Sequence, residues 1–170
     1  MNNTKKLTLA GMCLALGVIV PQAFHAIPNA GTIFLPMHIP VLVCGFICGP
    51  LFGLINGILT PILSNIIFSM PAATMLGQMT IELGTYGLMC GLLNELININ
   101  NTYVKNYVVL ISSMIIGRII YGLANALIFK AGAYSLNIWL SFAFITAIPG
   151  IVIQLILVPI LVSTITRKLK

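Results

Sequence analysis

The chain has 170 residues, of which 59% are hydrophobic and only 6% are charged. A soluble domain has about a quarter of its residues charged, so this composition excludes a soluble globular protein and predicts an all-α, multi-pass membrane protein. The two acids are Glu82 and Glu95 and no Asp occurs, which excludes paired-Asp metal sites and Ser-His-Asp triads. No G-x-x-x-x-G-K-[ST] motif is present to bind ATP. We therefore expect neither an enzyme nor a site for a metal or cofactor.

Six apolar segments follow one another along the chain, and each is a candidate to cross a hydrocarbon core about 30 Å thick. The first follows two lysines, and we interpret it as a retained helix and not as a cleaved signal peptide, because many apolar segments come after it. The run 41–68 is too long for one crossing, so a break is expected at Gly49-Pro50, where Pro ends the hydrogen-bond ladder. The predicted spans are 7–24, 36–49, 51–69, 75–93, 107–129 and 138–165, the last kinked by Pro149 and Pro159. We expect them to form one compact six-helix bundle.

The net charge of +6 arises from cations grouped at the ends of apolar segments. Six crossings place Lys5, Lys6 and Lys105 on the same side as the C-terminal group Arg167, Lys168 and Lys170. The positive-inside rule assigns that side, and with it both termini, to the cytoplasm. The positive charge therefore indicates contact with an anionic lipid bilayer, and no nucleic-acid partner is expected.

Small residues recur at helical spacing in two of the predicted spans. Glycines stand every four residues from 45 to 57, which favours helices that pack closely within the chain. Gly11 and Ala15 form a similar small pair in the first span, and this pair faces either another helix of the chain or a partner. Cys44 and Cys48 also have helical spacing, and we interpret them as packing residues and not as a site for a soft metal.

Glu82 and Arg118 are the only charged residues inside the predicted spans. Each costs roughly 2.5–3.5 kcal/mol or more at mid-membrane unless it is paired or hydrated, so each is a candidate for function. Two interpretations stay open and are compatible, namely a buried ion pair and a ligand site.

Polar and aromatic side chains accompany both charges at helical spacing, which predicts the wall of a water-accessible pocket. Gln78, Glu82, Thr85 and Tyr86 share one face of the fourth span, and Arg118, Tyr121 and Asn125 share one face of the fifth. His38 and Trp139 border outside loops, as does Lys130, which adds positive potential near the pocket. The predicted substrate-binding residues are Arg118, Glu82, Tyr121, Asn125, Gln78, Tyr86, Trp139 and His38.

The chain resembles the substrate-binding S component of an energy-coupling factor (ECF) vitamin transporter. The resemblance is carried by the basic start and small-residue first helix, Leu35-Pro36-Met37-His38-Ile39-Pro40-Val41-Leu42, Gly45-Phe46 through Gly49-Pro50, Gly53, Gly57 and Pro61, and by Glu82-Leu83, Tyr86-Gly87 and Gly91-Leu92. It implies a prokaryotic plasma-membrane protein of six helices that captures a vitamin from outside, with the first outside loop as a lid. It also implies docking on a shared transmembrane coupling protein driven by two ATPase subunits. Gly11 and Ala15 then match the family's Ala-x-x-x-Ala docking motif, with Gly in place of one Ala.

The identity of the substrate stays open at this point. Arg118 offers a bidentate site for a carboxylate, which favours a small carboxylate vitamin such as niacin or pantothenate. Folate, riboflavin and pyrimidine precursors remain alternatives. An autonomous secondary carrier or a partner-stabilising membrane subunit is the alternative function, although residues 1–85 and 86–170 show no clear repeat. A membrane enzyme is disfavoured, because Ser64, Ser69 and Ser112 lack a G-x-S-x-G context.

Overall fold

The computed structural model describes residues 2–24, 30–129 and 135–169. The helices in order are α1 (Asn3–Ile19), η1 (Val20–Phe24), α2 (Ala30–Phe34), α3 (His38–Cys48), α4 (Pro50–Phe68), α5 (Ala73–Leu96), α6 (Thr102–Ala124), η2 (Asn125–Phe129), α7 (Leu136–Leu140), η3 (Ser141–Ile145) and α8 (Ile148–Leu169). No strand occurs within these ranges. The all-α fold class predicted from the sequence is confirmed.

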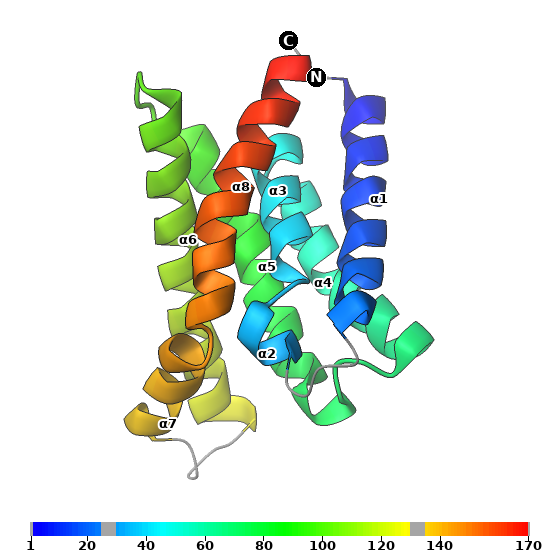
Figure 1. Cartoon of the computed structure of the whole chain (residues 1–170), viewed down its shortest axis with the longest axis vertical. Helices are drawn as coiled ribbons and strands as arrows, with labels where there is room; N and C mark the ends of the chain where they lie inside the picture. The colour runs from blue at the N-terminus through cyan, green and yellow to red at the C-terminus, as the bar shows by residue number, and fades with distance from the viewer. Residues whose placement is uncertain (1, 25–29, 130–134, 170) are drawn as a thin grey trace.

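The long helices α1, α3, α4, α5, α6 and α8 run along the long axis of the molecule, and both termini lie at the same end (Figure 1). Five apolar helical stretches within the described ranges have the length and composition to cross a membrane: Asn3–Phe24, Gly31–Cys48, Pro50–Phe68, Thr102–Phe129 and Ile148–Lys168. Helix α5 is less apolar, but its 24 residues extend about 36 Å. The structure therefore has the helices of a multi-pass membrane protein, and the count of six crossings stays a prediction.

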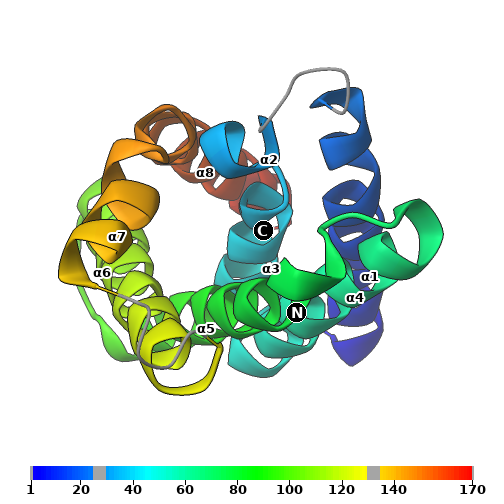
Figure 2. The ribbon, with the colours of Figure 1, turned by 90° about the horizontal axis from the view of Figure 1, so that it is seen from below.

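Helices α3 and α5 lie in the middle of the bundle. Figure 2 shows α1 and α4 on one side of them and α6 and α8 on the other, and the packing of α3 against both α1 and α8 agrees. An apolar core fills the space between α3, α5, α6 and α8. We define the apolar core as Leu42, Val43, Phe46, Tyr86, Cys90, Val109, Leu110, Met114, Val158 and Val162.

The break expected at Gly49-Pro50 separates α3 from α4. Gly49 has φ +96°, a conformation that L side chains rarely adopt, and Pro50 takes the first position of α4. Gly45 of α3 and Gly53 of α4 both lie against Gly87 of α5. A Cβ added to Gly45 would stand 2.5 Å from the carbonyl oxygen of Gly87, and a Cβ added to Gly53 would stand 2.7 Å from the carbonyl carbon of Gly87. These glycines therefore let the backbones of α3 and α4 approach the backbone of α5 closely.

Two predicted spans differ from the helices that the structure contains. The span 138–165 is divided into α7, η3 and α8, because Pro149 lies in the first turn of α8, where its missing N–H costs no hydrogen bond. The span 107–129 begins earlier, at Thr102, because Asn101 caps α6 by accepting hydrogen bonds from the N–H groups of Tyr103 and Val104. Between the first two predicted spans, the structure contains the short helix α2.

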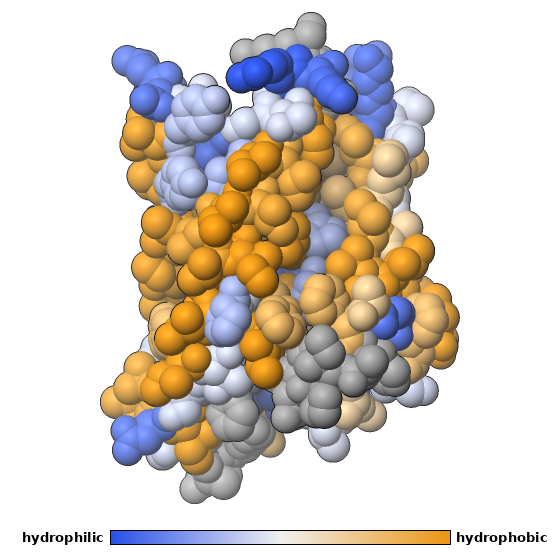
Figure 3. Space-filling view, viewed as in Figure 1, coloured by the Kyte–Doolittle hydropathy of each residue, from blue (hydrophilic) through white to orange (hydrophobic). Residues whose placement is uncertain are grey.

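The surface separates into an apolar belt and a cationic end (Figure 3). We define the cationic end as the end of the bundle that carries Lys5, Lys6, Lys105, Arg167 and Lys168, where both termini lie. Exposed isoleucines such as Ile55, Ile115 and Ile156 cover the belt, as expected of a surface that contacts lipid. The positive-inside rule assigns the cationic end to the cytoplasm, and the opposite end to the outside.

Cys44 and Cys48 pack with Ala10 of α1 in a small buried apolar cluster. Among the residues that the structure describes, no group of three His, Cys, Asp or Glu side chains is arranged to hold a metal ion.

Candidate functional site

Glu82 and Arg118 form a buried ion pair between α5 and α6. Glu82 Oε1 lies 3.0 Å from Arg118 Nη1, and the two side chains are only 5% and 6% exposed. Glu82 stands nine residues from the start of α5 at Ala73, about 13 Å along its axis. Pairing explains how two charges are tolerated at this depth, since each alone would carry a large desolvation cost. Of the two interpretations left open by the sequence, the ion pair is present.

Two further side chains lie against the Glu82 carboxylate, and one of them is hydrogen-bonded to it. The Tyr86 hydroxyl, one turn along α5, donates a hydrogen bond of 3.2 Å to Glu82 Oε1. His38 Nε2, at the start of α3, lies 3.8 Å from the same oxygen, and the His38 and Tyr86 rings meet edge to face at 5.3 Å. Three helices therefore contribute to one buried polar cluster.

The polar stripes of α5 and α6 also meet nearer the outside. The Tyr121 hydroxyl donates a long hydrogen bond of 3.5 Å to Gln78 Oε1. The Asn125 side-chain amide donates to the Tyr121 carbonyl oxygen at 2.8 Å. Trp139 of α7 donates from Nε1 to the Arg118 carbonyl oxygen at 3.0 Å. The structure thus joins His38, Glu82, Tyr86 and Arg118 in one cluster and Gln78 with Tyr121 in a separate pair. Asn125 and Trp139 bond to backbone carbonyl groups of α6.

One residue of this region was missed by sequence reasoning, namely Gln154 of α8. It is fully buried, and neither its Nε2 nor its Oε1 has a hydrogen-bond partner within the described part of the chain. Gln154 lies one turn before Val158 of the apolar core, as His38 lies one turn before Leu42, so both border the core on its outward side. A lone amide in the apolar run 151–158 was the available signal, since a polar group buried in a membrane helix is costly.

We call this group the polar layer and define it as the buried residues His38, Gln78, Glu82, Arg118, Asn125 and Gln154 together with the half-buried Tyr121. Besides the amide of Gln154, it contains Asn125 Oδ1 and both ring nitrogens of His38, buried atoms for which the described residues supply no hydrogen bond. A buried polar atom without a partner costs about 1–3 kcal/mol. A bound ligand or water that completes these hydrogen bonds would remove that cost, so the polar layer is suited to bind a polar molecule.

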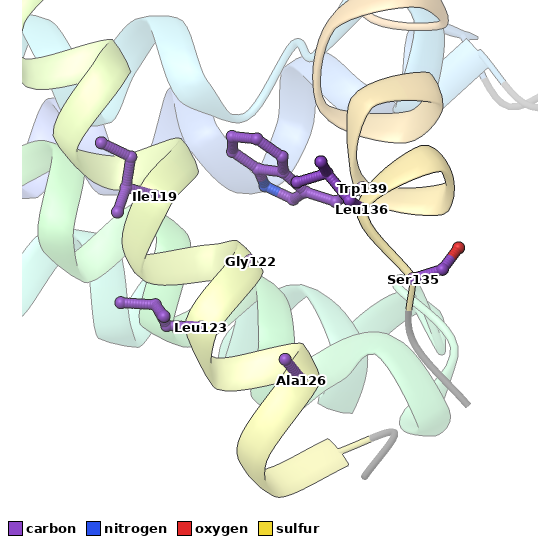
Figure 4. A pocket seen from close by; sticks show the side chains of 7 residues that line it. All are labelled: Ile119, Gly122, Leu123, Ala126, Ser135, Leu136 and Trp139. Carbon is purple, nitrogen blue, oxygen red and sulfur yellow. The ribbon is translucent and has the colours of Figure 1, made fainter. Parts of the chain in front are cut away.

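Two cavities lie outside the polar layer. The first, of about 250 Å³, lies between α6 and α7 and is apolar; its lining residues are Ile119, Gly122, Leu123, Ala126, Ser135, Leu136 and Trp139 (Figure 4). The second, of about 690 Å³, lies at the cationic end. Glu82 and Arg118 line neither cavity. The ion pair is therefore enclosed by protein in this conformation, and of the predicted binding residues only Trp139 borders one of these two cavities.

The predicted docking pair lies on an exposed face of α1. Gly11 and Ala15 are both exposed, and a Cβ added to Gly11 would meet nothing within 4 Å. The opposite face holds α1 to the bundle, where Asn56 donates a 2.7 Å hydrogen bond to the Ala10 carbonyl oxygen and Gly17 packs on Thr60. The small pair therefore faces lipid or a partner and not another helix of this chain. Lys130, the remaining predicted contributor, lies outside the described residues.

A family model described as "ECF transporter, substrate-specific component" matches residues 5–162, which is nearly the whole chain. No curated protein and no solved structure matches the chain.

Proposed function

The chain belongs to the family of ECF transporter substrate-specific components, and we propose that it captures a small carboxylate vitamin, such as niacin or pantothenate, from outside the cell. The family membership makes it a substrate-binding transporter subunit in the cell membrane, of a kind that works with an ECF module and is not an enzyme. Within the proposal, the polar layer is the binding site for the vitamin.

The observation that carries the proposal is the buried polar layer on the outward side of the apolar core. The core closes the bundle toward the cytoplasm, so a ligand held by the polar layer would be accessible from outside only. Polar anchors beside aromatic rings, here Tyr86, Tyr121 and Trp139, are typical of small-molecule sites.

The ion pair supports a carboxylate as the feature that is recognised. A guanidinium binds a carboxylate bidentately, and in the enclosed conformation the Glu82 carboxylate takes that place on Arg118. We propose that the carboxylate of the vitamin replaces Glu82 at Arg118, while Tyr86 keeps its hydrogen bond to Glu82 and His38 remains beside it. Before the vitamin binds, the Glu82 carboxylate would neutralise the charge of Arg118 in the empty site.

The proposed partners are a shared transmembrane coupling protein and two ATPase subunits. The chain has no P-loop motif, and within the proposal the partners bind and hydrolyse the ATP that drives uptake. The exposed pair Gly11 and Ala15 offers a smooth helix face against which a partner helix can pack closely.

A thermal-shift screen of the purified protein against water-soluble vitamins tests the proposal. We expect one carboxylate vitamin to raise the unfolding temperature, since a ligand at 100 times its Kd stabilises by about 2.7 kcal/mol. Its amide counterpart, for example nicotinamide against niacin, should give a much smaller shift. Arg118→Lys keeps the positive charge but loses the bidentate fork, and should weaken binding, whereas the matched variant Arg167→Lys should not.

Three outcomes would contradict the proposal. A screen in which no vitamin shifts the unfolding temperature would contradict the proposal that the protein captures a vitamin. Equal shifts from the acid and its amide would show that the carboxylate is not the group that the protein recognises. Uptake into liposomes by this chain alone, driven by an ion gradient, would indicate an autonomous carrier in place of a subunit.

A further inference from the structure

The larger cavity lies at the cationic end, far from the polar layer. It has a volume of about 690 Å³ and is lined from the end of α3, the start of α6 and the last turns of α8. By the positive-inside rule this is the level of the headgroups of the cytoplasmic leaflet. Its position on the side of α6 and α8 separates it from the exposed face of α1 (Figure 2).

Among the described residues, the lining of the cavity contains two cations and no acid. Lys105 and Arg167 both line it. The two acids of the chain lie elsewhere, because Glu82 is paired with Arg118 and Glu95 lies beside Gly49, near Lys6. The cavity therefore attracts an anion.

The lining contains both polar and apolar side chains. Asn106 and Ser163 are joined by a 3.3 Å hydrogen bond beside the two cations, and Asn106 is buried, with only 4% of its surface exposed. Phe46 and Val162, which belong to the apolar core, also line the cavity. The space is far larger than one phosphate ion needs, and its two kinds of lining suit a molecule with an anionic head and an apolar body.

We propose that this cavity binds the headgroup of an anionic phospholipid of the cytoplasmic leaflet. Lys105 and Arg167 contact the phosphate, for which both side chains are suited, and Asn106 and Ser163 supply further polar contacts. Phe46 and Val162 contact the glycerol and the first part of an acyl chain. The site thus anchors α6 and α8 to the cytoplasmic leaflet, and it does not depend on the proposed vitamin site.

Lipid titration of the delipidated protein in neutral detergent, followed by native mass spectrometry and by thermal unfolding, tests the proposal. Phosphatidylglycerol, phosphatidylcholine and inorganic phosphate are the three probes. The variant Lys105→Gln/Arg167→Gln removes the two cavity cations, and Lys5→Gln/Lys168→Gln removes two cations from the same end outside the cavity lining. Because a cation near an anionic surface contributes roughly fivefold in affinity, we expect the cavity variant to bind phosphatidylglycerol about 25-fold more weakly and the matched variant to bind it nearly as the parent does.

Preferential binding of phosphatidylglycerol that only the cavity variant loses would support the proposal. Equal stabilisation by inorganic phosphate would assign the site to a free anion and overturn the lipid. Equal binding of phosphatidylcholine, or equal losses in the two variants, would show that the cavity does not select an anionic headgroup. A cavity variant that binds lipid normally but fails to assemble with the coupling protein would assign the surface to that protein.

Discussion

Replacing one residue of the ion pair between Glu82 and Arg118 should destabilise the protein more per substitution than replacing both residues together. At 3.0 Å and an effective dielectric constant of 20, the attraction between the two charges is about 5.5 kcal/mol. Glu82→Gln alone leaves a buried guanidinium, and Arg118→Met alone leaves a buried carboxylate, so each should lower the free energy of unfolding by about 3–5 kcal/mol. The double variant buries no charge, and the amide oxygen introduced by Glu82→Gln can still accept the hydrogen bond from Tyr86. We therefore expect it to cost at least about 3 kcal/mol less than the sum of the single variants.

Equilibrium unfolding of the four proteins in mixed micelles with sodium dodecyl sulfate measures this double-mutant cycle. Glu95→Gln is the control for the loss of an acid: Glu95 is exposed at the cationic end, so its change should stay within about 0.5 kcal/mol. Additive effects of Glu82→Gln and Arg118→Met would refute the reasoning, because the charges would then not stabilise each other. Single variants as stable as the parent protein would show that water reaches the pair.

Two more predictions concern the small residues. Gly53→Ala should lower the free energy of unfolding by about 1–3 kcal/mol, because its Cβ would clash with the backbone of Gly87. Gly11→Ala, which has open space around it, should not be destabilising in the same equilibrium unfolding assay. Equal effects of the two variants would contradict the close approach of α4 and α5. Ala15→Leu should leave vitamin binding intact but lower vitamin uptake in cells that contain the ECF module. The matched variant Ala73→Leu, at an exposed position at the start of α5, should leave uptake unchanged. Normal uptake with Ala15→Leu would show that α1 is not the docking helix.

The sequence singled out the two residues of the ion pair because charge is unusual in a membrane span. Glu82 and Arg118 were the only charges in apolar spans, so their meeting was an expected way to reduce a cost of several kcal/mol each. Helical spacing also gave the partners on the same helices, such as Tyr86. The family assignment from motifs is confirmed by the match over residues 5–162.

Other features depended on tertiary structure that spacing does not contain. Gln154 is polar but uncharged, and only its complete burial on the outward side of the core makes it part of the site. Trp139 reaches the Arg118 carbonyl because the chain between α6 and α8 folds back as the separate helix α7, where the sequence predicted one continuous span. The role of each binding residue stays a prediction that the vitamin screen addresses.

The contact between Gly53 and Gly87 has a consequence for how the molecule can move. Where two helix backbones touch, there is no intervening layer of side chains whose rotamers can change, so α4 and α5, with α3 beside them, form a rigid frame. Glu82, which stands on α5, is therefore carried by a part of the bundle that can move only as one piece.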